Sequence, residues 1–370
     1  MRSKFKKIQR CVALAVVLLL WPLAGVESVA KITRRMPQIL TQIVASATPE
    51  NPRHSEGSMV RLKDGRILFA YTEYYGGESE DHSPAKIVGT YTSDHGRTWS
   101  PKFTLLENIA RENVMSVTLL RLQSGEIAFF YLHKNSSSDL KAYIKLSRDE
   151  AKSWGAPACV TPVDGYHVMN NDRAIQLKSG RLLAPVASSP DFRKLDHWVS
   201  SVHYSDDLGK TWKKSKSEID LPKRGAMEPG LVELRDGSVM MIIRTQMGSV
   251  YKSFSRDGGV TWTAAESMGL VAPVAPATIS RIPKTGDLLI VWNNASDKRT
   301  PLTTAVSKDE GKTWQNIQNL ECDPRFAYAY TSILFDGDWA LLSYWVHQRT
   351  PEGHLISMKI AAMEVDWFYQ

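Results

Sequence analysis

The stretch that decides the fold reads AMEPGLVELRDGSVMMIIRTQMGSVYKSFSRDGGVTW and covers residues 226–262. It carries the carboxylate Glu228 near its start, continues as two apolar runs separated by Arg-Asp-Gly, and ends in the motif SRDGGVTW. Asp-Gly between two apolar runs is a strong short-range signal for a β-hairpin. Glu228 and Arg244 start and finish this hairpin, so antiparallel pairing is expected to bring an acid and a base to the same end of it.

Both parts of this stretch recur along the chain. An S-x-D-x-G-x-T-W turn occurs at residues 92–99, 147–154, 205–212, 255–262 and 307–314, and the second copy is degenerate, with Ala151 for Gly and Ser153 for Thr. A strand–turn–strand pattern alternates with it, with turn glycines at Gly65, Gly125, Gly180, Gly237, Gly286 and Gly337. The steps of 49 to 60 residues leave room for about four short strands and little else. Six such units predict an all-β fold, a six-bladed β-propeller.

The recurring turns are predicted to be structural. Their Asp and hydroxyl groups can bond backbone N–H groups locally, their Gly takes a special backbone angle, and their Trp covers the blade edge. We therefore do not interpret their Asp residues as catalytic. The alternating C-terminal run, residues 354–368, is expected to supply the last strands, and residues 34–47 are expected to pair with it to close the ring.

The first thirty residues have the pattern of a cleavable signal peptide. A basic start, MRSKFKKIQR, precedes the apolar run CVALAVVLLLWPLAG, and residues 28–30 offer small side chains for cleavage. An uncleaved anchor is the alternative, but the apolar run is short for a membrane span. We therefore expect residues 31–370 to form a single propeller domain, secreted or periplasmic, with no membrane attachment in the mature form.

Composition and charge exclude several function classes. The chain is 43% hydrophobic and 23% charged, as an ordinary globular protein is. Without residues 1–30, which hold five basic residues and one acid, the net charge falls from +7 to +3, which argues against a nucleic-acid partner. Cys159 and Cys322 could pair, or could remain two buried thiols. The sequence shows no metal-ligand spacing, phosphate loop or serine nucleophile elbow, so no metal or cofactor is expected.

In a propeller the innermost strands of all blades converge on one central site. Residues near the ends of those strands are therefore the candidates for chemistry. In chain order they are Arg53 and Glu56, the loop residues Glu80, Asp81 and His82, then Asn170, Asn171, Asp172 and Arg173, Glu228 and Arg244, Arg299, and Tyr328 and Tyr330.

This set resembles the sialidase (neuraminidase) superfamily, specifically secreted sialidase-like proteins with Asp-box repeats. Such proteins carry a Glu before a V-E-L-x-D-G-x-L hairpin that closes with an Arg, as Glu228 and Arg244 do around LVELRDGSVMMIIR. Arg299 resembles the family's Arg before a late Asp box. Tyr330 resembles its Tyr before the last hairpin, and Asp81 its loop Asp before the first box.

The resemblance is weakest at the start of the first blade. The family's first Arg normally opens that blade in an R-I-P motif, whereas Arg53 lies about two residues early, and Glu56 is an extra acid nearby. This departure leaves the identity of the acidic sugar open.

The resemblance implies a retaining exo-α-sialidase-like glycoside hydrolase that acts on sialylated or other acidic glycans. Tyr330 would be the nucleophile, Glu228 its base, and Asp81 the acid and base at the leaving oxygen, with Glu80 and His82 as rivals. Paired charge-assisted bonds from arginine suit the carboxylate of such a sugar. The implied substrate-binding residues are Arg244, Arg299, Arg53, Arg173, Asp172, Glu56 and Tyr328. A hydrolase of another acidic sugar and a non-catalytic carbohydrate-binding propeller remain alternatives.

Overall fold

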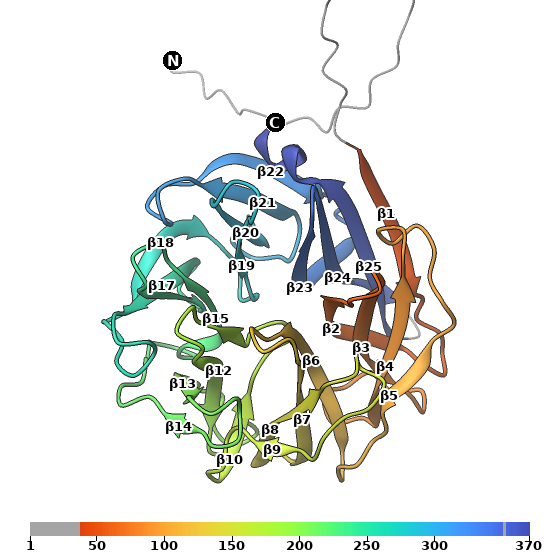
Figure 1. Cartoon of the computed structure of the whole chain (residues 1–370), viewed down its shortest axis with the longest axis horizontal. Coiled ribbons are helices and arrows are strands. Elements are labelled where there is room, and N and C mark those ends of the chain that lie inside the picture. Colours follow the sequence, from red (N-terminus) through yellow and green to blue (C-terminus); the bar gives the residue numbers. More distant parts are fainter. Residues whose placement is uncertain (1–37, 351–352) are drawn as a thin grey trace, which may run out of the picture. The chain divides into compact units, whose positions relative to one another are not determined.

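The structure, a computed structural model, describes residues 38–350 and 353–370 (Figure 1). These residues form strands β1 to β25 and one short 3₁₀-helix, η1 (Val365–Tyr369). The predicted signal peptide lies outside the described residues, so it and the domain boundary at residue 30 stay predictions. Within the described part of the chain, no helix is long and apolar enough to cross a membrane.

The strands form six blades, and in each blade neighbouring strands pair as in a meander. The first blade is β2 (Arg53–Arg61), β3 (Ile67–Tyr74), β4 (Ala85–Thr92) and β5 (Phe103–Leu106). The second is β6 (Asn113–Arg121), β7 (Ile127–Ser136), β8 (Asp139–Ser147) and β9 (Ala158–Cys159). The third is β10 (Gly165–Val168), β11 (Ile175–Gln176), β12 (Leu182–Ser189), β13 (Val199–Ser205) and β14 (Lys213–Lys214).

The last three blades follow the same order. The fourth is β15 (Met227–Glu233), β16 (Val239–Arg244), β17 (Ser249–Ser255) and β18 (Glu266–Val271). The fifth is β19 (Thr278–Arg281), β20 (Leu288–Asn293), β21 (Leu302–Ser307) and β22 (Gln315–Glu321). The sixth is β23 (Phe326–Asp336), β24 (Trp339–Thr350), β25 (Gly353–Glu364) and β1 (Ile39–Ala45). Figure 1 shows β2, β6, β15, β19 and β23 innermost in this arrangement, which is the predicted six-bladed propeller.

Strand β1 completes the sixth blade. It pairs antiparallel with β25, from Ile39 opposite Met363 to Ala45 opposite Met358. One blade therefore combines strands from both ends of the described chain. The expected pairing of the early segment with the C-terminal run is confirmed for residues 39–45.

The S-x-D-x-G-x-T-W turns, the Asp boxes, lie between the last two strands of each of the first five blades. In each box the Asp accepts one bond from the backbone N–H and one from the hydroxyl of the residue four positions later. The degenerate second box keeps both bonds, because Ser153 donates to Asp149 through its N–H at 2.9 Å and its hydroxyl at 2.5 Å. No box Asp lines the central pocket. Their predicted structural role is confirmed.

Blades pack face to face through apolar side chains, and the described residues form six core clusters, one at each interface between neighbouring blades. Two boxes add ion pairs at these interfaces. Glu310 binds Arg281 bidentately, with both N–O distances 2.8 Å, and accepts the backbone N–H of Arg235 from the fourth blade at 2.8 Å. Glu150 binds Arg121 in the same way in the second blade. These links fix the innermost strands on which the central site depends.

Candidate active site

Four innermost strands carry a β-bulge at equivalent points. The pairing register shifts within Ser55–Ser58 of β2, Met115–Thr118 of β6, Met227–Gly230 of β15 and Ala329–Ser332 of β23. One residue in each bulge has a positive φ, an uncommon conformation for a residue with a side chain. These residues are Glu56 (57°), Ser116 (55°), Glu228 (39°) and Tyr330 (58°). All four line the central pocket, so the bulges direct these side chains into it.

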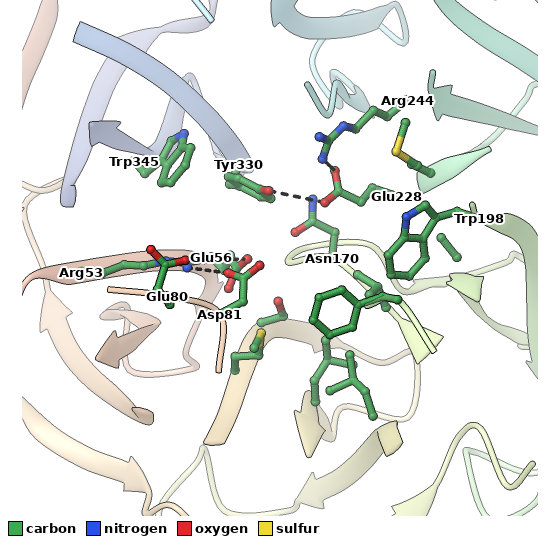
Figure 2. Close-up of a pocket in the computed structure, with 18 of the residues that line it drawn as sticks. Arg53, Glu56, Glu80, Asp81, Asn170, Trp198, Glu228, Arg244, Tyr330 and Trp345 are labelled. Atoms are coloured by element: carbon green, nitrogen blue, oxygen red, sulfur yellow. Dashed lines mark hydrogen bonds and ion pairs between the residues drawn. The ribbon is translucent and has the colours of Figure 1, made fainter. Parts of the chain in front are cut away.

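The pocket has a volume of about 470 Å³ and two unlike sides. One side is charged and comes from the first, fourth, fifth and sixth blades. The other comes from the second and third blades and is mainly apolar, with Met115, Leu132, Leu140, Tyr166, Phe192 and Trp198. Figure 2 shows Arg53, Glu56 and Asp81 grouped together, Glu228 beside Arg244, and Tyr330 between these two groups.

Glu228 joins Arg244 and Tyr330. Its Oε2 accepts a bond from Nη1 of Arg244 at 2.6 Å, and its Oε1 accepts the Tyr330 hydroxyl at 3.4 Å (Figure 2). Hairpin pairing explains the first contact, because Arg244 lies opposite Met227 in the ladder. This confirms the expected meeting of acid and base at one end of the hairpin.

The hydroxyl of Tyr330 keeps its proton in this site at neutral pH. Burial and the nearby Glu228 raise the pKa of Tyr330 to about 12, although Arg299 and Arg244 act in the opposite direction. Attack by this oxygen therefore requires a base, and Glu228 is within reach of the proton. The three residues together form a hydroxyl, a proton acceptor and a cation that orients the acceptor.

Arg299 covers the other side of Tyr330. Its guanidinium carbon lies 5.6 Å from the centroid of the Tyr330 ring and 5.4 Å from that of Trp345. Burial lowers the pKa of Arg299, whereas for Arg244 the opposing effect of Glu228 and Tyr330 raises the pKa above its ordinary value. Two cations therefore lie beside one neutral phenol.

Asp81 and Arg53 form the second charged group. Nη1 of Arg53 lies 2.6 Å from Oδ1 of Asp81, whose side chain is 65% exposed in the mouth of the pocket. Partial desolvation would raise the pKa of Asp81, but the charge and hydrogen bond of Arg53 lower it below its ordinary value. Glu80 also lines the pocket, whereas His82 does not.

Glu56 lies beside Arg53 at the base of this group. Its Oε1 is 3.6 Å from Nη2 of Arg53, and the residue is only 6% exposed. Burial raises the pKa of Glu56 to about 7, with Asp81 and Glu228 acting in the same direction and Arg53 against them. Glu56 therefore passes between its protonated and its ionised form near neutral pH.

Three predicted substrate-binding residues lie outside the pocket. Asp172 accepts bonds from the Ser58 hydroxyl at 2.9 Å and the Ile333 N–H at 3.0 Å, so it links inner strands of two other blades. Arg173 donates to Thr278 and to the carbonyl of Ala277.

Tyr328 is the third of these residues. It is 2% exposed and packs edge-on against Tyr344. Asp172, Arg173 and Tyr328 therefore have partners within the fold and do not line the pocket, and their role in substrate binding stays a prediction that the pocket geometry does not favour.

Other pocket residues were not found from the sequence. Trp345 lies edge-on to Tyr330 with ring centroids 5.0 Å apart, and Ser116 also lines the pocket. Asn170, by contrast, was among the candidates from the sequence and does line the pocket. Trp345 and most of the apolar side belong to strands whose sequences indicate only a buried sheet, whereas Phe192 and Trp198 lie between β12 and β13.

Residues 65–342 match the profile of the BNR repeat-like domain family over most of the chain. The chain belongs to this family. This BNR-repeat protein is 26% identical over 290 residues to a sialidase of Paraclostridium sordellii, which covers 70% of each chain. It is 27% identical over 313 residues to a sialidase of Bacteroides fragilis, which covers 74% of this chain and 56% of the relative. These matches place it among sialidase-like BNR-repeat proteins.

Solved structures show the same fold. A protein of unknown function from Dyadobacter fermentans superposes with a TM-score of 0.72 at 20% identity, covering 88% of this chain and 99% of that one. The NanB sialidase of Streptococcus pneumoniae gives a TM-score of 0.70 at 16% identity, covering 90% of this chain and 71% of that one. Trypanosoma rangeli sialidase gives 0.68 at 17% identity, covering 88% and 59%.

The sequence left open whether Cys159 and Cys322 form a disulfide. Cys159 lies in β9 of the second blade, and Cys322 follows β22 of the fifth. The structure has no disulfide between them.

Proposed function

We propose that this chain is a retaining exo-α-sialidase-like glycoside hydrolase that releases a terminal acidic sugar, sialic acid, from glycoconjugates. The observation that carries the proposal is the contact of the Tyr330 hydroxyl with Glu228 at 3.4 Å, with Arg244 holding the same carboxylate. A binding protein has no need of a paired nucleophile and base. The sialidases among its relatives favour the same reaction class.

The residue types suit a sugar that carries a carboxylate on its anomeric carbon. Arg244 and Arg299 supply cations for that carboxylate. An attacking carboxylate would be repelled by it, whereas neutral Tyr330 is not, and a tyrosine nucleophile is the form that this chemistry takes in sialidases.

The first step forms a glycosyl–tyrosine bond. The Tyr330 oxygen attacks the anomeric carbon while Glu228 takes the phenolic proton. The bond from that carbon to the leaving oxygen breaks, and Asp81 gives its proton to this oxygen.

The second step reverses these roles. Asp81 takes a proton from a water molecule, whose oxygen attacks the anomeric carbon. The bond to Tyr330 breaks, and Glu228 returns the proton to the phenolic oxygen. Two displacements at one carbon retain its configuration.

The test replaces Tyr330 by Phe, with Tyr328→Phe as a matched control on the same strand. Tyr330→Phe removes the nucleophilic oxygen and should lower turnover of a chromogenic α-sialoside by at least ~10³-fold, while Tyr328→Phe should retain activity. Mass spectrometry should find the label of a fluorinated sialosyl substrate on Tyr330. A label on a carboxylate, or near-normal activity of Tyr330→Phe, would refute the mechanism.

Two other outcomes identify the alternatives. Cleavage of uronides in place of sialosides would indicate another acidic sugar. Binding of sialosides without turnover by the wild-type chain would indicate a carbohydrate-binding propeller.

A further inference from the structure

Arg53 has most of its hydrogen-bonding capacity engaged within the protein. Its Nε donates to the Ser55 hydroxyl at 3.1 Å, and its Nη1 donates to the Ser79 carbonyl at 3.2 Å and to Asp81 at 2.6 Å. Its Nη2 faces Glu56 at 3.6 Å. A guanidinium has five N–H donors, so few remain for a ligand. The residue is also only 6% exposed.

Arg244 and Arg299 differ from Arg53 in this respect. Arg244 bonds Glu228 through Nη1, and its buried Nε has no hydrogen-bond partner among the described residues. Arg299 donates from Nη2 to the Val274 carbonyl at 3.2 Å, and no described carboxylate lies within ion-pair distance of it. Both line the pocket and have N–H groups left for a ligand.

Side chains from three strands bind the loop that carries Asp81. The Asp81 carbonyl accepts bonds from Asn113 of β6 at 2.9 Å and from Lys134 of β7 at 2.8 Å. Arg53 of β2 binds both the loop backbone, at Ser79, and the Asp81 carboxylate. Asn113 and Lys134 therefore fix the loop, whereas Arg53 also fixes the direction of the carboxylate.

We propose that the acidic group of the substrate is bound by two arginines, Arg244 and Arg299, and that Arg53 is a positioning residue that holds Asp81. This inference rests on the proposed function of the site. The carboxylate of Asp81 already balances the charge of Arg53. Glu56 adds a second negative charge nearby when it is ionised. The first blade therefore contributes to protonation of the leaving group and not to recognition of the anion.

The proposal predicts a dependence on the leaving group. A nitrophenolate leaves without much acid assistance, whereas the sugar alcohol of sialyllactose needs a proton from Asp81. Arg53→Lys keeps the charge but loses the planar guanidinium, whose Nε reaches Ser55 while its Nη1 reaches Ser79 and Asp81. It should lower kcat on sialyllactose by about 100-fold and on 4-nitrophenyl α-sialoside by less than about tenfold, with KM little changed.

Arg299→Lys is the matched comparison. It should raise KM by a similar factor for both substrates, because both carry the same carboxylate. If Arg53→Lys raises KM as Arg299→Lys does, or slows both substrates equally, Arg53 binds the anion and the proposal is wrong. Arg53→Gln provides a second variant, and thermal unfolding of each variant checks that the fold is intact.

A readout independent of turnover separates this proposal from the proposed function. The groups that face Asp81 are Arg53 and Glu56 from β2, Tyr74 from β3, Lys134 from β7, Tyr166 from β10 and His82 from its own loop. Carbon-13 NMR of the Asp81 carboxyl should show a higher pKa in Arg53→Gln than in the wild-type chain. An unchanged pKa would overturn the proposal, whereas a wild-type chain inactive on every sialoside would overturn only the proposed function.

Discussion

Replacing Glu56 by Gln should stabilise the fold at neutral and alkaline pH. Glu56 is buried at the base of the pocket, and Arg53 is 3.6 Å away, too far for a strong ion pair. Burial raises the pKa of Glu56 from its ordinary value of 4.5 to about 7. Burying the ionised carboxylate therefore lowers the free energy of unfolding. A neutral amide of the same shape does not have this destabilising effect.

The sign of the effect follows from proton binding. Between pH 4.5 and 7 the folded chain binds this proton more tightly than the unfolded chain does, so stability falls as pH rises through this window. Above pH 7 the loss is complete and amounts to roughly 3 kcal/mol, since each tenfold change in proton affinity is worth about 1.4 kcal/mol. Glu56→Gln should recover a gain of that order at pH 8 and almost none at pH 4.

The assay is urea unfolding of the wild-type chain and Glu56→Gln at several pH values between 4 and 8. The difference in unfolding free energy between the two chains should grow with pH and level off near pH 7. Glu50→Gln, at an exposed position, is the control and should show no such growth. A Glu56→Gln variant that is less stable than wild type at pH 8 would refute the reasoning.

Three further predictions concern the site and the blade interfaces. Arg244→Lys loses the planar fork and should lower kcat/KM on a chromogenic α-sialoside at least about tenfold; equal kinetics with an exposed Arg→Lys variant would count against its role. Because Arg53 lowers the pKa of Asp81, kcat/KM should rise as pH falls from 8 towards 5, and a rate that falls over this range would contradict Asp81 as the acid. Glu310→Ala removes the carboxylate that binds Arg281, which keeps only carbonyl acceptors, and leaves the N–H of Arg235 without its acceptor, so it should cost about 1–3 kcal/mol in urea unfolding; an unchanged midpoint would show that this link does not matter.

The repeats predicted the fold because they are local. Each Asp box bonds its own backbone, and each Asp-Gly turn fixes one hairpin, so neither depends on distant sequence. The contact of Glu228 with Arg244 was predictable for the same reason, since hairpin pairing alone joins them. The contact of Tyr330 with Glu228 spans two blades and came from the family resemblance.

The β-bulges explain why the strand pattern did not predict which of Tyr328 and Tyr330 faces the pocket. In a regular strand Tyr328 and Tyr330 would share one face, because side chains alternate with a period of two. The bulge in Ala329–Ser332 breaks that alternation, so Tyr330 faces the pocket and Tyr328 packs in the core. No glycine marks the positive φ of Tyr330, so the strand pattern alone does not indicate that these two side chains point to different faces.

Where the chain accepts backbone strain is informative about function. Among the described residues, twelve other than glycine have a positive φ, and ten of these lie either at the inner strands or in the Asp boxes. Such a conformation costs on the order of 1–3 kcal/mol outside glycine and persists only where the surroundings enforce it. In the boxes, Glu150 and Glu310 use it to reach the neighbouring blade.

At the centre, Asp172 and Ser116 also bond to other blades, whereas for the other three residues no such structural gain is evident. Glu56, Glu228 and Tyr330 make few contacts that hold blades together, and glycine would fit their backbone angles with less strain. What glycine lacks is a carboxylate or a phenol directed into the pocket. The six apolar interfaces between blades make the fold rigid enough to maintain this backbone strain. Glu56, Glu228 and Tyr330 occupy strained positions at the centre, and Glu228 and Tyr330 are residues to which we assign the chemistry. The distribution of strain therefore points to a functional site at the centre, in agreement with the function that we propose.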